Sequence, residues 1–358
     1  MPGVRTLVVS DLHLGARGEV DVLSADPAAL EALVAGVGGV DRLVLLGDTL
    51  ELRHGPPRDA LAAATPVLRA LAGALGRDAE VVLVAGNHDH RLVAPWLEQR
   101  LEAPEPPPLG LAERTTPDAT PLAAALAELL TPTRVVLDYP GTWLRDDVYA
   151  LHGHYLDRHL TVPSFERLAA GALARLVGRP VADASEPDDY EAVLAPLYAL
   201  LDAIAVRSHD RRGTPHSNAS VRVWQLLNSS GRHPLKGALL AGAIPIGVGA
   251  LNALGLGPVR ADLSGEELRR SALRAMADAL AALGVTAEHV VFGHTHRAGP
   301  GPSDDLSEWT LPGGARLVNS GCWVRDPLSP AGDESSPYRP GAAVLLDGDQ
   351  APRPVRLL

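Results

Sequence analysis

Short apolar runs that end in polar residues are the clearest pattern in the first third of the chain. Runs rich in Leu and Val occupy residues 7–10, 43–46 and 81–85, and their length is typical of buried strands. Residues 27–37 and 59–75, which lie between these runs, are rich in helix-forming Ala and Leu. Strands that alternate with helices predict a sheet covered by helices.

Strand-like runs return later in the chain, after a Pro- and Thr-rich stretch at 103–121 that we interpret as a loop or edge excursion. The further predicted strands are 135–137, 148–151, 290–292, 317–319 and 342–346. The strand-forming segments therefore lie toward the two ends of the chain.

The middle of the chain, residues 155–284, has a helical pattern instead. An apolar stripe at helical spacing comprises Tyr190, Val193, Leu194, Leu197, Leu201 and Ile204. Another helix is predicted from a capping box at Ser264 and Glu267 to a stop at Gly284. We interpret 155–284 as a helical cap or lid inserted into one catalytic domain that spans 1–358, and a separate domain is the alternative.

Five short motifs carry most of the candidate chemistry, and four of them directly follow a strand-like run. They combine carboxylates, imidazoles and an amide, which suit Mn, Fe or Zn and exclude an all-thiolate site. The motifs are Asp11-Leu12-His13, Gly47-Asp48, Gly86-Asn87-His88-Asp89, His152-Gly153-His154 and Gly293-His294-Thr295-His296. Each motif alone is weak evidence, but the five together predict a centre for two divalent metal ions.

The spacing within the motifs supports a shared cavity. Residues two apart on an extended segment project to the same face, so Asp11 and His13 can offer two ligands to one site. The same holds for His294 and His296. A glycine precedes the ligands in three motifs, where the backbone has to approach the metals closely.

The charge balance of this site fits a small anionic substrate, although the chain carries a formal net charge of -11. Two divalent ions outweigh the carboxylates of Asp11 and Asp48 and leave a positive site for a phosphate group. The acidic balance of the whole chain argues against a broad basic face, and therefore against nucleic acid as a partner.

Composition and the chain start indicate the compartment. Hydrophobic residues make up 46% and charged residues 21% of the chain, as in globular proteins that dissolve in water. Cys322 is the single cysteine, so no intramolecular disulfide can form, and we expect it to be buried packing rather than a redox group. Met1 is followed by no basic-then-apolar leader. We therefore expect a cytoplasmic protein.

The five motifs, in this order, resemble the calcineurin-like metallophosphoesterase superfamily, whose pattern is D-x-H, G-D, G-N-H-[DE], H and G-H-x-H. The resemblance implies a four-layer α/β/β/α fold, in which two mixed β-sheets are sandwiched between helices, here with a large helical insertion. It also implies seven metal ligands: Asp11, His13 and His296 on one ion, Asn87, His152 and His294 on the other, and Asp48 between them. Manganese is the favoured metal, with Fe or Zn as alternatives.

The resemblance further implies a mechanism in which hydroxide activated by the metals attacks phosphorus in line. His88 would stabilise the transition state or protonate the leaving oxygen. Asp89 would orient a neighbouring group, with a solvated turn residue as the alternative. Glu51 is either a supporting carboxylate or an exposed one. His154 would then support a ligand or contact the substrate.

One branch of the superfamily is nearest in appearance. The segments Ser10-Asp11-Leu12-His13-Leu14-Gly15 and Leu46-Gly47-Asp48-Thr49-Leu50-Glu51, with the helical insertion, resemble UDP-diacylglucosamine pyrophosphatases. Those enzymes cut a pyrophosphate in a lipid-linked nucleotide sugar under a helical lid. That branch typically carries Arg at the position of His88, whereas phosphatases and phosphodiesterases of the superfamily carry His.

Two features of the predicted insertion concern its partners. Residues 237–259 carry no formal charge and are long enough to span a bilayer, but a single span would separate His294 from Asp11. The alternatives are a lid hairpin packed on its own domain and an apolar surface for peripheral membrane contact or a lipid substrate. A basic cluster either holds a substrate phosphate or ends a solvated helix: Arg207, His209, Arg211 and Arg212.

These observations favour a dinuclear-metal phosphohydrolase that cleaves a phosphoester or pyrophosphate bond in a small, nucleotide-linked or lipid-linked substrate. A nuclease or phosphodiesterase of the same superfamily is the alternative among enzymes. A non-catalytic scaffold that keeps the fold is the alternative from another class, and such a protein is expected to lack ligands. All seven ligand positions are filled here. The sequence leaves the oligomeric state open.

Overall fold

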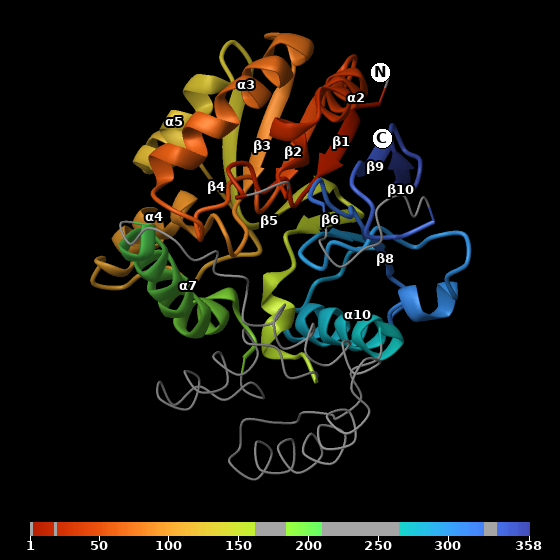
Figure 1. Cartoon of the computed structure of the whole chain (residues 1–358). Helices are drawn as coiled ribbons and strands as arrows, with labels where there is room; N and C mark the ends of the chain where they lie inside the picture. Colours follow the sequence, from red (N-terminus) through yellow and green to blue (C-terminus); the bar gives the residue numbers. More distant parts are fainter. Residues whose placement is uncertain (1–2, 18–19, 162–183, 210–264, 326–334) are drawn as a thin grey trace, which may run out of the picture. The chain divides into compact units, whose positions relative to one another are not determined.

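The computed structural model describes residues 3–17, 20–161, 184–209, 265–325 and 335–358 (Figure 1). The chain divides into two compact units. Unit 1 comprises Met1–His154, Tyr198–Asp210 and Val285–Leu358, and unit 2 comprises Tyr155–Leu197 and Arg211–Gly284.

The strands of unit 1 form one large mixed sheet, with the order β10-β9-β1-β2-β3-β5-β6-β7-β8 and with β4 paired to β5. Strands β1, β2, β3 and β5 are parallel, and so are β6, β7 and β8. The strands are β1 (Arg5–Val9), β2 (Arg42–Leu46), β3 (Glu80–Val84), β4 (Ala112–Thr115), β5 (Arg134–Arg145), β6 (Val148–Leu151), β7 (His289–Phe292), β8 (Arg316–Asn319), β9 (Ala342–Asp347) and β10 (Arg353–Arg356).

The helices of unit 1 flank this sheet. The helices and short 3-10 turns of the described residues are α1 (Val22–Ala25), α2 (Pro27–Val37), α3 (Pro57–Leu75), η1 (His90–Leu92), α4 (Ala94–Leu101), η2 (Pro117–Ala119), α5 (Pro121–Leu129), η3 (His154–Arg158), α7 (Pro187–His209), α10 (Gly265–Ala282) and η6 (Leu306–Trp309). Helix α3 begins at a proline, which suits the first helical position, and ends before Gly76, whose φ of 75° is left-handed.

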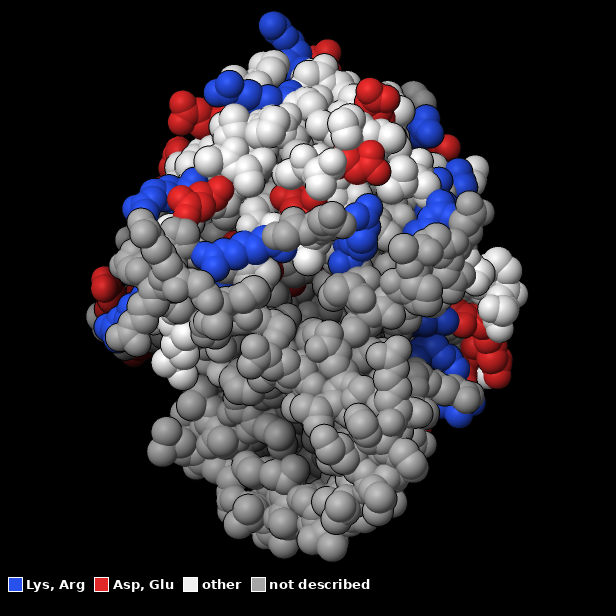
Figure 2. All heavy atoms as spheres, in the orientation of Figure 1, with Lys and Arg blue, Asp and Glu red and all other residues white. Residues whose placement is uncertain are grey.

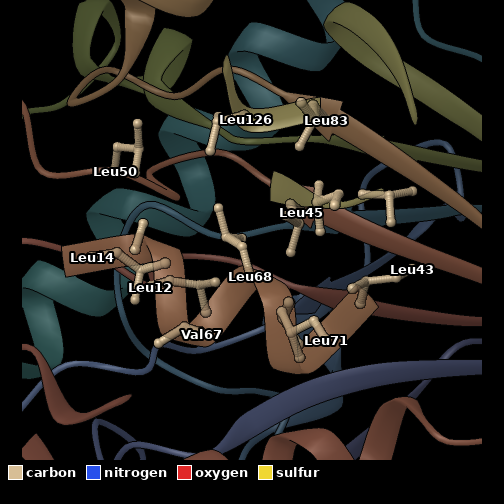
Figure 3. Packing of buried hydrophobic residues seen from close by; sticks show 14 of the residues in the cluster. Leu12, Leu14, Leu43, Leu45, Leu50, Val67, Leu68, Leu71, Leu83 and Leu126 are labelled. Carbon is tan, nitrogen blue, oxygen red and sulfur yellow. The ribbon is translucent and has the colours of Figure 1, made fainter. Parts of the chain in front are cut away.

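The face of β1, β2 and β3 that meets α3 forms an aliphatic core (Figure 3). Leu71 follows Val67 by four residues and Leu68 by three along α3, so the three side chains lie on one side of the helix. They pack with Leu43 and Leu45 of β2. This leucine core fixes the strand ends from which the polar motifs project.

The opposite face of the same strands is also buried, which explains why their sequences are apolar at successive positions. Val44 and Leu46 of β2 point to this second face and join side chains from β1, β3, β5, β6, β7, β8 and β9 in one cluster. Because strands from both halves of the sheet share this cluster, the sheet curls until it is nearly closed into a barrel.

The pairing does not separate the described strands into the two sheets expected from the sequence. Strand β5 is twelve residues long, pairs with β3 and β4 through its first part, and pairs with β6 through its last part. It therefore connects both halves of the sheet. The sequence pattern predicts only 135–137 as strand, because the polar Asp138 ends the apolar run and Pro140 and Gly141 follow it.

The other predicted strands are confirmed to within a few residues, as are the helices at 27–37 and 59–75. Of the two alternatives for 103–121, a loop or an edge excursion, the second fits residues 112–115, where β4 pairs antiparallel with β5 and lies off the main strand order. Cys322 is buried, as expected. Strand β10 at the C-terminal end was not predicted, because its Arg353-Pro354-Val355-Arg356 sequence lacks an apolar run.

The described residues of unit 2 are mainly helical. Tyr155 stacks on Tyr190 at a centroid distance of 4.5 Å and donates a hydrogen bond to Glu191 at 2.7 Å. The predicted helices around 190–204 and up to Gly284 are confirmed as α7 and α10. The stripe prediction for α7 is wrong at Ile204, which is 50% exposed.

No helix among the described residues is both long and apolar enough to cross a bilayer. Residues 237–259, Ser264 and Arg211 lie outside the described residues. The lid hairpin and the lipid-facing surface therefore both stay predictions.

Candidate metal centre

The predicted ligands lie at the carboxyl ends of five strands of the curled sheet. Asp11 follows β1, Asp48 follows β2 and Asn87 follows β3. In the other half of the sheet, His152 follows β6, and His294 and His296 follow β7. Loops at the carboxyl ends of parallel strands meet at one edge of a sheet, which is where α/β proteins bind ligands.

Backbone hydrogen bonds continue from one ligand loop to the next. The N–H groups of Asp11 and His13 donate to the carbonyls of Gly47 and Asp48, at 3.1 and 2.8 Å. The loop after β7 is joined to the first loop as well, because the backbone N–H of His294 donates to Oδ2 of Asp11 at 3.0 Å. Hydrogen bonds within the chain therefore hold the ligand loops next to one another.

Five ligand residues have left-handed backbone conformations. Among the described residues, the non-glycine positions with positive φ are Asp11, His13, Asp48, His294 and His296, with φ between 46° and 65°. Such angles cost energy in residues with a Cβ and gather at functional sites. The expected extended conformation of the D-x-H and H-x-H segments is therefore wrong. Left-handed turns direct the two ligands of each motif.

The glycines before the ligands allow close backbone approach, as predicted. A Cβ on Gly86 would lie 2.2 Å from Oδ1 of Asp48 and 2.6 Å from the Asp48 backbone nitrogen. A Cβ on Gly293 would lie 2.6 Å from Oδ2 of Asp11. All three distances are shorter than real carbon contacts, so these loops can meet only where the side chain is absent.

The first cluster of ligand atoms is formed by Asp11, His13 and His296. The Nε2 atoms of the two histidines are 3.2 Å apart, and Oδ1 of Asp11 is 3.3 Å from Nε2 of His296. Oδ1 of Asp11 is buried and makes no hydrogen bond to a donor among the described residues. Acceptor atoms that face one another in a buried space are favourable only if protons or a cation lie between them.

The second cluster is formed by Asn87, Asp48, His152 and His294. Oδ1 of Asn87 is 3.2 Å from Nε2 of His152 and 3.1 Å from Nδ1 of His294. Nδ1 of His152 lies 2.9 Å from the carbonyl of Leu46, so a neutral ring donates there and turns the lone pair of Nε2 inward. Hydrogen bonding alone would favour the Asn87 amide the other way round. The oxygen-inward orientation suits a cation.

Asp48, a member of the second cluster, also reaches the first. Its Oδ2 atom is 3.3 Å from Nε2 of His152 in the second cluster and 3.6 Å from Nε2 of His13 in the first. One carboxylate therefore reaches both groups of ligand atoms. Together the two clusters offer imidazoles, carboxylates and an amide oxygen, a donor set that fits two divalent first-row metal ions.

The pKa values reflect the negative charge gathered here. Burial opposes ionisation of Asp11, but the neighbouring His296 and His152 outweigh it and lower the pKa of Asp11 to about 2. Burial also opposes protonation of His13, yet Glu51 and Asp48 raise its pKa to about 9. Asp48 and Asp11 raise the pKa of His152 to about 10, again against burial. A site that binds protons this tightly also attracts metal cations, which compete with those protons.

His88 and Glu51 form a pair beside the clusters. Oε2 of Glu51 is 2.8 Å from Nδ1 of His88 and 3.1 Å from Nδ1 of His13. Glu51 is buried, which excludes the exposed alternative. Burial and the neighbouring Arg53 lower the pKa of His88 to about 4. Glu51 therefore orients a predicted ligand and the predicted acid with one carboxylate.

Asp89 joins the second and third motif loops. Its carboxylate is buried and accepts hydrogen bonds from the backbone N–H groups of four residues: Asp48, Thr49, Leu50 and Gly86. Burial and the nearby Asp48 raise its pKa to about 6. The alternative of a solvated turn residue is wrong. Asp89 therefore positions the backbone of the Asp48 loop.

The three predicted substrate-binding residues do not lie together in the described part of the chain. His154 is buried next to Tyr139, whose Oη atom is 3.3 Å from its Nε2, and is absent from the clusters of ligand atoms that the described residues form. Arg207 is exposed on α7. Arg211 lies outside the described residues.

Sequence reasoning missed three residues that border the site. Asn319, at the end of β8, donates from Nδ2 to the carbonyl of Gly293 and to Oγ1 of Thr295, both at 3.0 Å. Ser10 bonds to Asp11 and to Ser320. Arg53 reaches His88. The strand-end position of Asn319, like that of the motifs, was an available signal, whereas no pattern distinguishes Arg53.

The chain belongs to the calcineurin-like phosphoesterase family, whose family model matches residues 4–200. It is therefore a metal-dependent phosphoesterase. The matched range ends before His294 and His296, which the fold brings to the other ligands. A crystal structure of a dimetal phosphatase from Danio rerio is similar at 13% identity, with 100% of each chain covered and a TM-score of 0.34. Comparison with curated proteins gave no match.

Proposed function

We propose that this protein is a dinuclear-metal phosphohydrolase that cleaves a phosphoester or pyrophosphate bond. In this proposal one ion is held by Asp11, His13 and His296, the other by Asn87, His152 and His294, and Asp48 contacts both. The observation that supports it most is the set of buried acceptor atoms turned toward one another, with Oδ2 of Asp48 within 3.6 Å of a histidine nitrogen in each cluster. Manganese is the metal that we expect, with Fe or Zn as alternatives.

Two bound divalent cations would lower the pKa of a water molecule and withdraw charge from the phosphoryl oxygens. The residues of the chain would do the rest. Glu51 accepts a hydrogen bond from Nδ1–H of His88 and so orients the ring, and His88 would stabilise the transition state at the leaving oxygen. Asp89 holds the Asp48 loop through backbone hydrogen bonds. The partly exposed side of the site carries His88 and His296, whose side chains are 15% and 33% exposed, and the substrate enters there.

The proposal extends to architecture and location. Residues 155–284 would be a cap on a catalytic domain that spans 1–358, and the curled sheet would correspond to the four-layer α/β/β/α arrangement. A small, nucleotide-linked or lipid-linked phosphate would be the substrate, in the cytoplasm or at a membrane surface met by 237–259. On the face of the molecule drawn in Figure 2, acidic and basic side chains are interspersed over the described residues. A mixed surface of this kind favours a small substrate over nucleic acid.

The test is a comparison of wild type with Asp48→Asn after loading with manganese. Bound metal is measured by mass spectrometry, and hydrolysis is measured on a phosphomonoester, a phosphodiester and a nucleotide pyrophosphate. We expect two ions per wild-type chain and turnover of at least one substrate, and a loss of at least about a thousandfold in kcat/KM in the variant. Exposed Asp118→Asn is the matched control and should behave as wild type.

Three outcomes would contradict the proposal. Equal rates in wild type and Asp48→Asn would assign the activity to a contaminant or another site. Wild type with neither bound metal nor turnover would favour the scaffold. Cleavage of DNA that persists at about 0.2 M salt would favour a nuclease, because binding driven by phosphate contacts alone weakens steeply with salt.

A further inference from the structure

The turn that follows β8, Asn319-Ser320-Gly321, belongs to none of the five motifs, yet it contacts two of them. The side chains of Asn319 and Ser320 are buried, so their polar atoms need partners inside the protein. Strand β8 is last in the pairing order of the described sheet, and neither β7 nor β8 lies next to β1. The contacts of this turn therefore join loops that strand pairing leaves apart.

The side chain of Asn319 braces the loop after β7. Its Nδ2 group donates to the carbonyl of Gly293 and to Oγ1 of Thr295, both at 3.0 Å. Its Oδ1 atom accepts from the backbone N–H of Gly321 at 2.8 Å, so each side of the amide has a suitable partner. Gly293 and Thr295 belong to the fifth motif. This one amide therefore holds the turn that provides a predicted ligand to each cluster.

Ser320 reaches the loop after β1 through Ser10. The Oγ atoms of the two serines are 2.7 Å apart, and Oγ of Ser10 is also hydrogen-bonded to Oδ2 of Asp11. Because a carboxylate is the strongest acceptor in this group, the hydroxyl of Ser10 donates to Asp11 and accepts from the hydroxyl of Ser320. The backbone adds a further bond, since the N–H of Trp323 donates to the carbonyl of Asp11 at 3.0 Å. The segment after β8 thus holds the first predicted ligand.

These bonds make the two carboxylate oxygens of Asp11 different. Oδ2 accepts from Ser10 and from the backbone N–H of His294, the latter at 3.0 Å. Oδ1 makes no hydrogen bond among the described residues and lies 3.3 Å from Nε2 of His296. Because Oδ2 is held by two donors, the carboxylate cannot turn without losing them. Oδ1 therefore stays directed at the first cluster of ligand atoms.

The turn after β8 supports the two clusters unequally. In the first cluster, Asp11 is held through Ser10, and His296 lies in the loop that Asn319 braces. In the second cluster only His294 belongs to a braced loop, because the other members follow β2, β3 and β6. Loss of the turn's hydrogen bonds should therefore weaken the first cluster more than the second.

Resting on the proposed function, we infer that Asn319 and Ser320 are positioning residues for the metal ion of the first cluster. Asn319 sets the turn that carries His296. Ser320 acts through Ser10 and keeps Oδ1 of Asp11 directed at the same ion. Neither residue is itself a ligand. Groups that orient metal ligands in this way typically change metal affinity by about ten- to a hundredfold, which sets the size of the effect to be measured.

The primary test measures the two bound ions separately and does not depend on turnover. Wild type and Ser320→Ala are titrated with manganese. Mass spectrometry counts the bound ions, and electron paramagnetic resonance distinguishes a coupled pair of Mn²⁺ ions from a single one. We expect Ser320→Ala to bind the first ion about tenfold more weakly and the second as in wild type, so that a single-ion signal appears at low manganese. Ser303→Ala removes the same hydroxyl from an exposed serine and should match wild type.

A double-mutant cycle tests whether Ser320 acts through Ser10. Ser10→Ala alone should weaken the first ion, because Oδ2 of Asp11 loses one of its two donors. Adding Ser320→Ala to Ser10→Ala should then weaken it by less than about twofold more, since the hydrogen bond between the two serines is already absent. Losses that simply multiply would overturn the inferred chain, because two independent effects on the structure would combine in that way.

The Asn319 brace is tested at its partner Thr295, so that the buried amide stays in place. Thr295→Val keeps the shape of the side chain but removes the hydroxyl that accepts from Nδ2 of Asn319. We expect affinity for the first ion to fall about tenfold. Thr295→Ser keeps the hydroxyl and should recover most of that affinity. Equal affinities in the Val and Ser variants would show that the brace does not position the ligand.

The outcomes separate this inference from the proposed function. Wild type that binds no pair of manganese ions contradicts the proposed function itself. Wild type that binds the pair, with unchanged affinities in Ser320→Ala and Thr295→Val, overturns only the inference about the turn. Variants weakened equally at both ions overturn it as well, because a loosened sheet would affect both clusters alike. If Ser320→Ala does not fold, the two Thr295 variants still decide the question.

Discussion

The leucine core and the metal centre lie on opposite sides of the same loops and obey opposite rules. Leu12 and Leu14 point into the aliphatic core, whereas Asp11 and His13, their neighbours in sequence, point into the cluster of ligand atoms. The core side gains free energy simply by leaving water. On the ligand side, buried carboxylates and imidazoles in left-handed backbone cost free energy unless a cation joins them. The free energy gained by the core therefore offsets the cost of holding the ligand site, which would not form by itself.

The core can be weakened without touching the ligands. Leu68→Ala removes a fully buried side chain of α3, and we expect the free energy of unfolding to fall by about 3 kcal/mol. Denaturant unfolding measures it, and Leu101→Ala, at a residue 68% exposed, should change it by less than about 0.5 kcal/mol. Manganese affinity of the folded variant should stay as in wild type. A parallel loss of affinity would show that core and site are not separable.

The site can be disturbed without touching the core. Gly86→Ala places a Cβ 2.2 Å from Oδ1 of Asp48 and 2.8 Å from Cδ2 of His152, so the ligands have to shift. We expect kcat/KM to fall about a hundredfold, the effect of a displacement of about 1 Å in a catalytic site. Gly73→Ala in α3 is the matched control, since its Cβ meets nothing within 4 Å. Unchanged turnover in Gly86→Ala would mean that the loops adjust freely.

The carboxylate that supports the ligands gives a smaller effect. Glu51 accepts from the backbone N–H of Arg53 at Oε1 and contacts His13 and His88 through Oε2, so Glu51→Gln, which keeps the shape but has only one acceptor oxygen, cannot keep all three contacts. We expect kcat/KM to fall about thirtyfold, within the range for groups that orient metal ligands. Exposed Glu31→Gln is the control. If manganese affinity and turnover both match wild type, Glu51 has no positioning role.

The pH dependence of manganese affinity tests whether protons and metal compete for the same ligands. Its expected change per pH unit is smaller than the effects of the variants above. The pKa values of His13 and His152, raised to about 9 and 10, mean that both rings are protonated at neutral pH without metal. We expect manganese affinity, measured by titration from pH 8 to 6.5, to fall about tenfold per pH unit for each proton that the metal displaces. An affinity independent of pH would contradict these protonation states.

The same pKa values predict a stability profile for the metal-free protein. Both histidines have folded-state pKa values above their unfolded values, so their stabilising effect is complete below about pH 6.5. It is lost as the pH rises through about 9 for His13 and about 10 for His152. The Tm of metal-free protein should therefore decrease from pH 7 to 10, and metal-loaded protein should not follow this decrease.

Much of the site was predictable because its residues are concentrated at strand ends. The apolar runs of β1, β2, β3, β6 and β7 are readable, and a polar motif begins within two residues of the end of each strand. The positions of Glu51, Asp89 and Arg53 were not predictable to the same degree. Their roles depend on which atoms lie within about 3 Å in the folded chain, and local sequence carries no such information.

The sequence by itself determined the ligand types, their order, the apolar strands that precede them and the family to which the chain belongs. Only the tertiary structure decided that β5 continues for twelve residues and joins both halves of the sheet, and that the D-x-H and H-x-H motifs turn through left-handed backbone. It alone brought Arg53 against His88. The physical reason is that apolar pattern and residue type act locally, whereas strand partners, backbone angles and charge contacts are selected by the packing of the whole sheet.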